Sequence, residues 1–331
     1  MFRPVMITRI LLPAAALAAL SLPAFAEDKA PSAPPAVHEA TQDTKEKKDL
    51  PDYIRFAEDE KSTRLEIASK SFSLPDGVTV DLVGVVHIAD ADYYKDLNKR
   101  FEAYDAVLFE LVGDPGDLQS AAKKPQAAKK EKPTGAIHFL QTSMGKYLNL
   151  QFQLGSIDYT RPNMVHADTT WEEFAAMQKA RGESMMGLMM RAMRAQLSGE
   201  MDDLPVQDLD TVGLLRILLS KDSAAEFKKV LAKMFDRAES MTAIMEGDKG
   251  SAILSGRNEV VVKKLKEILS AKKNRKLAIF YGAAHMPGIE QSLIKDLGAK
   301  PGKEEWLAGW TMPKESLAAE KKAEKEPEEK K

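Results

Sequence analysis

The stretch GVTVDLVGVVHIADADYYKDLNKRFEAYDAVLFEL, residues 77–111, predicts a strand, a helix and a second strand. Both ends of the stretch are continuously apolar and rich in β-branched residues, which is typical of strands covered on both faces. Between them, Tyr94, Leu97 and Phe101 recur at helical spacing after Asp90, which stands in a capping position. A strand, a helix and a strand in this order are typical of a parallel sheet. The stretch therefore predicts an α/β fold.

The segments on either side extend this fold. Residues 63–69 form a β-branched run, and the turn LPDG at 74–77 separates it from the first strand, which predicts an N-terminal hairpin. Residues 276–282 predict a further strand that lies between two helices, and residues 136–250 show helical spacing. We expect an α/β domain at 53–312, with a mainly parallel sheet and a helical insertion between the two halves of that sheet.

The N-terminus is typical of a secretory signal peptide. Arg3 and Arg9 precede the apolar run 10–22, and the small-x-small pattern Ala-Phe-Ala ends at Ala26. The apolar run has about 13 residues, whereas a membrane span needs about 20, so we expect cleavage near Ala26 and no stable membrane span afterwards. The mature chain would then be periplasmic or secreted, which fits the absence of cysteine.

Polar segments flank the predicted domain. Residues 27–52 and 313–331 are rich in Pro, Ala and charged side chains, so we predict a disordered linker and a disordered charged tail. A loop at 120–135 has a similar composition. The 48 Lys and Arg residues nearly balance the 50 Asp and Glu residues, so the total charge does not indicate a nucleic acid as partner.

Three polar residues follow apolar strands at the points where those strands are predicted to end: His87, Glu110 and His285. The carboxyl ends of parallel strands open on one side of a sheet, and ligands of open α/β folds bind there, so these residues could converge. Gly84 and Gly282 each stand three positions before a histidine. A glycine at such a point permits a tight turn or the close approach of another group.

Two neutral imidazoles and one carboxylate form a metal-ligand set that leaves a position open for water. A divalent metal held there would lower the pKa of that water toward neutrality. With nitrogen and oxygen donors and no sulfur, Mn, Co and Zn all remain open. We predict a divalent-metal site at His87, Glu110 and His285, while hydrogen-bonded structural roles for the same residues stay the alternative.

Residues 82–111 and 256–293 together resemble the TraB/PrgY/GumN family, which is related to the Tiki metalloproteases. That family carries two Gly-x-x-His motifs, a Glu that ends the strand after the first motif, and an Arg-containing helix before the second. The resemblance covers the two ends of the folded region better than the helical middle. It maps residue by residue onto Gly84, His87, Glu110, Arg257, Gly282 and His285.

For the family members studied as enzymes, the resemblance implies a divalent-metal-dependent peptidase with a peptide or protein substrate. It also implies that Glu110 and Arg257 are catalytic, because an Arg near the metal would stabilise the oxyanion that forms when water attacks an amide. For most of the family the substrate is not established. Many relatives have Glu-Arg where this chain has Gly256-Arg257.

The loop PNMVHADTTWEEF, residues 162–174, contains two further candidates, His166 and Asp168. Asp168 or Thr169 could cap the following helix, which is the interpretation we favour, or the loop could face the crevice. A Thr-x-x-Glu capping box could begin at Thr169 or at Thr170. We interpret His138, on an apolar helical stripe, as a core residue.

The helix predicted at 183–197 is rich in methionine on one face, where Met186, Met189 or Met190, Met193 and Leu197 recur. We interpret this face as part of the core. A lid that contacts the substrate and a thioether copper site are the alternatives, because Met is adaptable and its sulfur is a soft ligand.

The sequence favours a secreted metal-dependent hydrolase that acts on peptide bonds. A periplasmic protein that binds haem or a metal without catalysis is the first alternative. A non-catalytic partner protein that works through its helical block and charged tails is the second. The sequence predicts neither the metal nor the oligomeric state.

Overall fold

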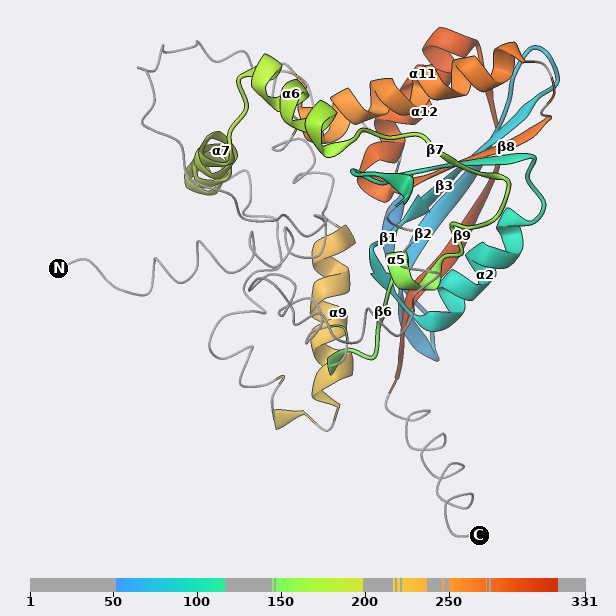
Figure 1. Cartoon of the computed structure of the whole chain (residues 1–331). Coiled ribbons are helices and arrows are strands. Elements are labelled where there is room, and N and C mark those ends of the chain that lie inside the picture. The colour runs from blue at the N-terminus through green and yellow to red at the C-terminus, as the bar shows by residue number, and fades with distance from the viewer. Residues whose placement is uncertain are drawn as a thin grey trace.

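The computed structural model has a mixed α/β fold built around one large sheet (Figure 1). It describes residues 52–116, 145, 147–198, 217, 219–220, 222–236, 246, 250–271, 273 and 275–314. The predicted signal peptide, the loop at 120–135, His138 and nearly all of the predicted linker and tail lie outside the described residues.

The sheet has seven strands in the order β1-β2-β3-β8-β5-β7, with β9 paired to β2. Its strands are β1 (Ile54–Glu58), β2 (Ser62–Ser73), β3 (Thr79–Val85), β5 (Ala106–Phe109), β7 (Met164–His166), β8 (Lys276–Gly282) and β9 (Lys300–Pro313). Strands β3, β8, β5 and β7 run parallel, whereas β1, β3 and β9 pair antiparallel with β2. A separate small sheet pairs β4 (Ile88–Ala89) with β6 (Gln151–Phe152).

The predicted N-terminal hairpin is confirmed. Ser73 of β2 lies opposite Thr79 of β3, and the Leu74 amide donates to the Val78 carbonyl across the turn at 2.9 Å. Gly77 adopts a φ of 73°, which Gly reaches without steric cost. The turn LPDG therefore fixes the register from which β3 enters the parallel half of the sheet.

Helices cover the sheet from both sides, with α11 and α12 on one side and α2 on the other (Figure 1). The described helices are α2 (Ala91–Phe101), α5 (Gln153–Ser156), α6 (Trp171–Arg181), α7 (Met185–Ser198), α9 (Ser223–Asp236), α11 (Arg257–Ser270) and α12 (Met286–Leu297), with a π-helix η2 (Ala252–Gly256) and a 3₁₀-helix η3 (Ala283–His285). Leu97 and Phe101 of α2 are fully buried, as their helical spacing predicts. None of the described helices has the length and apolar character of a membrane span.

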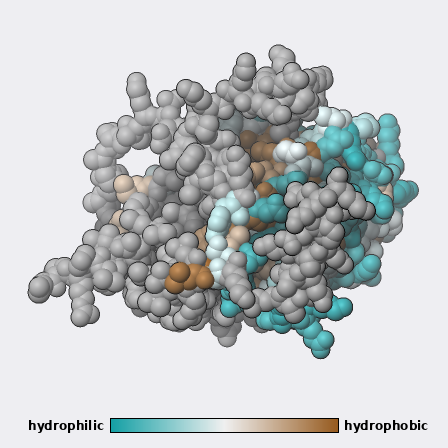
Figure 2. All heavy atoms as spheres, turned by 90° about the horizontal axis from the view of Figure 1, so that it is seen from below, coloured by the Kyte–Doolittle hydropathy of each residue, from teal (hydrophilic) through white to brown (hydrophobic). Residues whose placement is uncertain are grey.

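The core lies between the sheet and these helices. Leu82 of β3, Leu108 of β5 and Phe280 of β8 are all completely buried, so the continuously apolar strands are covered on both faces as predicted. Seen from below, the hydrophilic atoms gather on the right of the view, while hydrophobic atoms are visible toward the middle and in smaller groups on the left (Figure 2). The buried strands of the sheet hold the residues at their ends in fixed positions.

The range 136–250 is not wholly helical. It contains β7, which joins the main sheet beside β5, and β6, which falls within a segment that showed helical spacing. Strands of two or three residues are too short to display a periodicity of their own, and the helical spacing of their neighbours hid them.

Asp90 occupies the N-cap position of α2 but makes no side-chain bond to that helix. Its carboxylate instead accepts a hydrogen bond from the Lys228 ammonium of α9 at 2.6 Å and another from the Thr311 amide of β9 at 2.6 Å. Asp90 therefore ties α9 and β9 to the start of α2.

The core interpretation of the methionine-rich helix is wrong for the three methionines that the structure describes there. Met186, Met190 and Met193 of α7 are 65%, 53% and 38% exposed. An amphipathic pattern identifies a face of a helix, but it does not establish that another element covers that face.

Candidate functional site

The parallel strands end side by side at one edge of the sheet. In the register, Gly84 of β3 pairs with Tyr281 of β8, while Phe109 of β5 pairs with both Phe280 of β8 and His166 of β7. The residues that follow these strand ends are His87 after β3, His285 after β8, Glu110 after β5 and Asp168 after β7. The carboxyl edge of four neighbouring strands thus delivers one polar side chain each, which is where open α/β folds bind ligands.

Arg257, the first residue of α11, joins three of these side chains. Its Nη2 donates to Oε1 of Glu110 at 2.6 Å and to Oδ2 of Asp168 at 2.5 Å, and its Nε donates to Oδ1 of Asp168 at 2.9 Å. Its Nη1 lies 3.3 Å from Nε2 of His285. Asp168 therefore holds the guanidinium in a two-pronged contact, while Nη1 faces the histidine.

Burial would lower the pKa of Arg257, but the charges of Glu110 and Asp168 outweigh it and raise that pKa further above its usual range. Arg257 is only 5% exposed, yet it stays charged because it faces two carboxylates. A buried cation with paired partners of this kind keeps its geometry, since breaking one contact would leave a charge unpaired.

Glu110 is held directly on β8. Its backbone amide donates to the Phe280 carbonyl at 3.1 Å, and the Gly282 amide donates to its Oε2 at 2.5 Å. Burial would raise the pKa of Glu110, but Arg257, His285, His87 and the Gly282 amide together lower that pKa below its ordinary value. Glu110 is consequently an ionised carboxylate in a buried site.

His285 is buried and neutral. Burial lowers its pKa to about 4, against the opposing effect of Glu110. Its Nδ1 lies 2.8 Å from Oδ1 of Asn258, and its Nε2 lies 3.6 Å from Oε1 of Glu110. The Nε2 side of the ring thus faces Glu110 and Arg257, and the Nδ1 side faces the Asn258 amide.

His87 is half-buried and lies near this group without bonding to it. Its Nδ1 lies 2.9 Å from Oε1 of Gln153, and it is close enough for its electrostatic interaction to be among those that lower the pKa of Glu110 and of His285. Across the described ranges, no hydrogen bond or ion pair joins His87 to Glu110 or His285. The structure thus brings Glu110, Arg257 and His285 into contact and places His87 beside them.

The favoured interpretation of Asp168 as a helix cap is wrong. Thr170 is the N-cap of α6 and forms a capping box with Glu173, which leaves Asp168 free to bind Arg257. His166 does not reach Arg257. Its Nε2 lies 2.7 Å from the Leu111 carbonyl, and its ring packs against Phe109.

The two glycines of the Gly-x-x-His segments allow close approach rather than a tight turn. A Cβ added at Gly84 would lie 3.0 Å from Cγ2 of Ile67 and 3.1 Å from the Ala68 carbonyl oxygen, both on β2. A Cβ at Gly282 would lie 3.2 Å from Oε2 of Glu110. The first glycine therefore permits strand packing, and the second permits Glu110 to bind the backbone of β8.

A π-helical turn precedes Arg257. In η2 the Gly256 amide donates to the Ser251 carbonyl at 2.8 Å, five residues back. Such turns inside helices are frequent at functional sites. Gly256 packs against Met177, and Asp168, which follows β7, is the second carboxylate that binds Arg257.

Two residues of the site carried no signal in the sequence. Gln153 in α5 contacts His87, and Asn258 in α11 contacts His285. Asn258 stands in no motif, and Gln153 directly follows β6, a strand of two residues that has no pattern of its own, so only the fold brings each amide to its histidine. Within the described ranges, no group of three or more His, Asp or Glu side chains is arranged to hold a metal ion.

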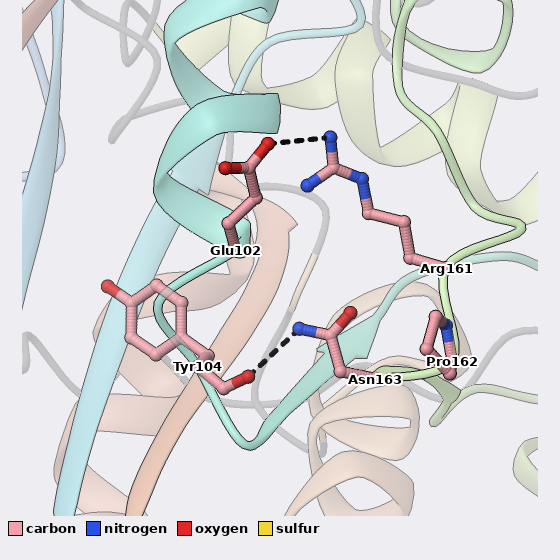
Figure 3. Close-up of a pocket in the computed structure, with 5 residues that line it drawn as sticks. All are labelled: Glu102, Tyr104, Arg161, Pro162 and Asn163. Carbon is pink, nitrogen blue, oxygen red and sulfur yellow. Dashed lines mark hydrogen bonds and ion pairs between the residues drawn. The ribbon is translucent and has the colours of Figure 1, made fainter.

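A surface pocket of about 450 Å³ lies at the opposite edge of the sheet, before the starts of β5 and β7 (Figure 3). Its charged and amide groups bind one another and the backbone: Arg161 pairs with Glu102 at 3.3 Å, and Asn163 donates to the Tyr104 carbonyl at 2.9 Å. The polar groups of the pocket thus stabilise the fold, and the pocket lies away from the Arg257 group.

Comparison with known proteins supports the assignment made from the two Gly-x-x-His segments. A family model described as the TraB/PrgY/gumN family matches residues 73–301. No curated protein and no solved structure matches the chain significantly. The match contains His87, Glu110, Arg257 and His285 and spans more than half of the 331 residues. The chain belongs to the TraB/PrgY/gumN family.

Proposed function

We propose that the protein is a secreted or periplasmic hydrolase that depends on a divalent metal and acts on peptide bonds. The observation that carries the proposal is the buried, ionised carboxylate of Glu110 beside the Nε2 of a neutral His285, 3.6 Å away, with a charged Arg257 in contact with both. Residues with shifted pKa values at the ligand-binding edge of an α/β sheet indicate a functional site.

The donor set suits a divalent metal such as Mn, Co or Zn. Glu110 and the Nε2 atoms of His87 and His285 would hold it, because the Nδ1 atom of each ring is already bound to an amide. The described residues do not form a complete three-ligand cluster, so the proposal rests on donor chemistry and on shared placement at one sheet edge. A divalent metal bound there would make a water molecule acidic enough to attack an amide near neutral pH.

The protein's own residues have distinct tasks in this proposal. The low pKa of Glu110 makes it a poor proton acceptor near neutral pH, so it serves as a ligand rather than as a general base. Asp168 binds Nε and Nη2 of Arg257, while Nη1 has no carboxylate partner in the described part of the chain. Nη1 is therefore the N–H group that can stabilise a developing oxyanion.

The test is hydrolysis of an unfolded peptide mixture by the mature protein, with and without a chelator. We expect chelation to abolish hydrolysis and His87→Ala or His285→Ala to reduce it by at least about 100-fold, the scale expected when a ligand or activating group is lost. His166→Ala is the matched control, because His166 also ends a parallel strand but binds the Leu111 carbonyl instead.

Activity that survives both His87→Ala and His285→Ala, or that ignores the chelator, would rule out this site as the source of hydrolysis. A metal that is retained by the wild type without any hydrolysis would instead support the non-catalytic alternative, a metal-binding protein. A Soret band on titration with haemin would identify the haem-binding form of that alternative.

A further inference from the structure

Each histidine of the proposed metal site is held at two points by a single amide residue. Asn258 contacts His285 through Oδ1 at Nδ1, 2.8 Å away, and through Nδ2, which donates to the His285 carbonyl at 3.3 Å. Gln153 contacts His87 through Oε1 at Nδ1, 2.9 Å away, and through its backbone amide, which donates to the His87 carbonyl at 2.9 Å. At both histidines one residue thus contacts Nδ1 and the backbone carbonyl, through the side-chain amide of Asn258 at His285 and through the side-chain and backbone amides of Gln153 at His87.

The partner of the Asn258 amide nitrogen establishes which way that amide points. A backbone carbonyl can only accept, so the Asn258 group that faces the His285 carbonyl must be the NH₂ group. Oδ1 of Asn258 therefore faces Nδ1 of His285 and can only accept a hydrogen bond from it. For Gln153, Nε2 donates to the Tyr159 hydroxyl at 3.0 Å and Oε1 faces Nδ1 of His87 at 2.9 Å, although a hydroxyl, unlike a carbonyl, can also donate.

We propose that Asn258 and Gln153 are positioning residues that keep the proton of each imidazole on Nδ1 and so present both Nε2 lone pairs to the carboxyl edge of the sheet. An amide oxygen at Nδ1 stabilises the tautomer with Nδ1–H, and a neutral ring has only one N–H. Metal-binding histidines typically donate their second ring N–H to such a partner.

Both positioning residues are buried. Gln153 is 2% exposed and Asn258 is 8% exposed, so neither amide can turn to water for an alternative partner. Asn258 follows Arg257 directly in the first turn of α11, so the same turn orients the guanidinium on one side of His285 and the amide on the other.

The inference rests on the proposed function for its role, but it can be tested without a metal. Long-range ¹H–¹⁵N NMR of metal-free protein labelled at its five histidines reports which ring nitrogen carries the proton in each. We expect the Nδ1–H form at both His87 and His285 in the wild type. The Nε2–H form at either residue would overturn the inference for that residue, and this readout needs no variant that could fail to fold.

Paired variants separate tautomer control from simple packing. Asn258→Leu should release the proton of His285 to a mixture of tautomers and leave His87 unchanged, and Gln153→Leu should do the reverse. Asn258→Asp and Gln153→Glu keep an acceptor oxygen and should keep Nδ1–H. Asn163→Leu is the control, since its amide donates to the Phe101 and Tyr104 carbonyls far from the site. An unchanged tautomer in both Leu variants would overturn the inference.

Titration with Mn²⁺ and Zn²⁺ adds the link to the proposed function. Each Leu variant should bind the metal about 10- to 100-fold more weakly than the wild type, the scale typical for partners of metal ligands. Wild-type protein with both rings in the Nδ1–H form but no metal binding would contradict the proposed function and leave the tautomer assignment standing. Equal metal affinity in wild type and Leu variants would contradict the positioning role.

Discussion

At the scale of single residues, the buried Arg257 carries the greatest electrostatic consequence. It is paired with both Glu110 and Asp168, which are 7% and 8% exposed. Arg257→Gln would leave two buried carboxylates without their cation, so we expect the free energy of unfolding to fall by about 3–5 kcal/mol. Urea denaturation of the two proteins measures this difference.

Arg55→Gln is the control for that prediction. The Arg55 side chain is 46% exposed, pairs with Glu66 at 2.7 Å and lies 4.1 Å from the centroid of the Trp306 ring, so its loss should cost at most about 2 kcal/mol. Equal destabilisation by the two substitutions would contradict the central role of Arg257. Arg257→Lys should recover part of the stability but not the two-pronged contact with Asp168, because a lysine lacks the planar fork.

The low pKa of His285 makes stability depend on pH. Its pKa falls from an ordinary 6.5 to about 4 in the folded protein, so between those values the unfolded chain binds a proton that the folded chain does not. The stabilising contribution is complete above pH 6.5 and is lost as the pH falls toward 4. Glu110 adds a loss of the same sign below its ordinary pKa of 4.5.

Unfolding measured from pH 7 to pH 4 in the wild type and in His285→Gln tests this assignment. We expect the slope of stability against pH to become shallower in the variant between 6.5 and 4, because its uncharged amide does not titrate. Parallel curves for the two proteins would show that the pH dependence arises elsewhere.

The residues of the site differ in how visible they are in the sequence. His87, Glu110 and His285 end apolar strands, so a rule about sheet edges selects them. Arg257 emerged only from the family resemblance, because a helix start has no comparable spacing signal. The prediction that Asp168 caps α6 is wrong. Thr169 and Thr170 each offer a capping box in the sequence, and a local pattern carries no information about a distant partner such as Arg257.

At the scale of elements, an Ala substitution at Gly84 or Gly282 should have a larger effect than one at a glycine in open space, because both of these glycines lie close to other atoms. Gly282→Ala would press a methyl group against Oε2 of Glu110, so we expect it to impair metal binding and hydrolysis more than folding. Gly84→Ala would meet the backbone of β2, so it should cost about 1–3 kcal/mol of stability, as overpacking typically does. Thermal unfolding and metal titration of each variant separate these effects.

Gly155→Ala is the matched control for the glycine variants. Gly155 lies in α5, and a Cβ there would meet no atom within 4 Å. We expect unchanged metal binding and a stability equal to or slightly above that of the wild type, because Ala restricts the unfolded chain. If Gly282→Ala bound the metal as tightly as Gly155→Ala, the close approach of Glu110 to Gly282 would not be needed for metal binding.

The elements with a clear local pattern were predictable from the sequence, whereas the very short strands β6 and β7 were not. Helices α2, α11 and α12 and strands β3, β5 and β8 follow from periodicity, apolar runs and turn residues. Strand β7 has only three residues, and its place beside β5 is a long-range pairing that no local pattern encodes. Missing β7 also hid the role of Asp168, which follows it.

At the scale of the whole molecule, the sequence predicts export and removal of the first 26 residues. Expression of the full chain in a double-membraned bacterium should yield a periplasmic protein that begins at Glu27, as measured by N-terminal sequencing. The substitution Leu17→Arg, near the middle of the apolar run, should retain the uncleaved chain in the cytoplasm. Full-length protein in the periplasm would contradict the prediction of cleavage.

The fold brings distant parts of the chain together at one edge of the sheet, and the proposed function requires that this edge binds a divalent metal. Elemental analysis of mature protein purified after exposure to Mn, Co and Zn measures this most directly. We predict about one divalent metal per wild-type chain and per His166→Ala chain, and none in the His87→Ala/His285→Ala double variant. A metal-free wild type, or equal metal in the double variant, would contradict the proposed site.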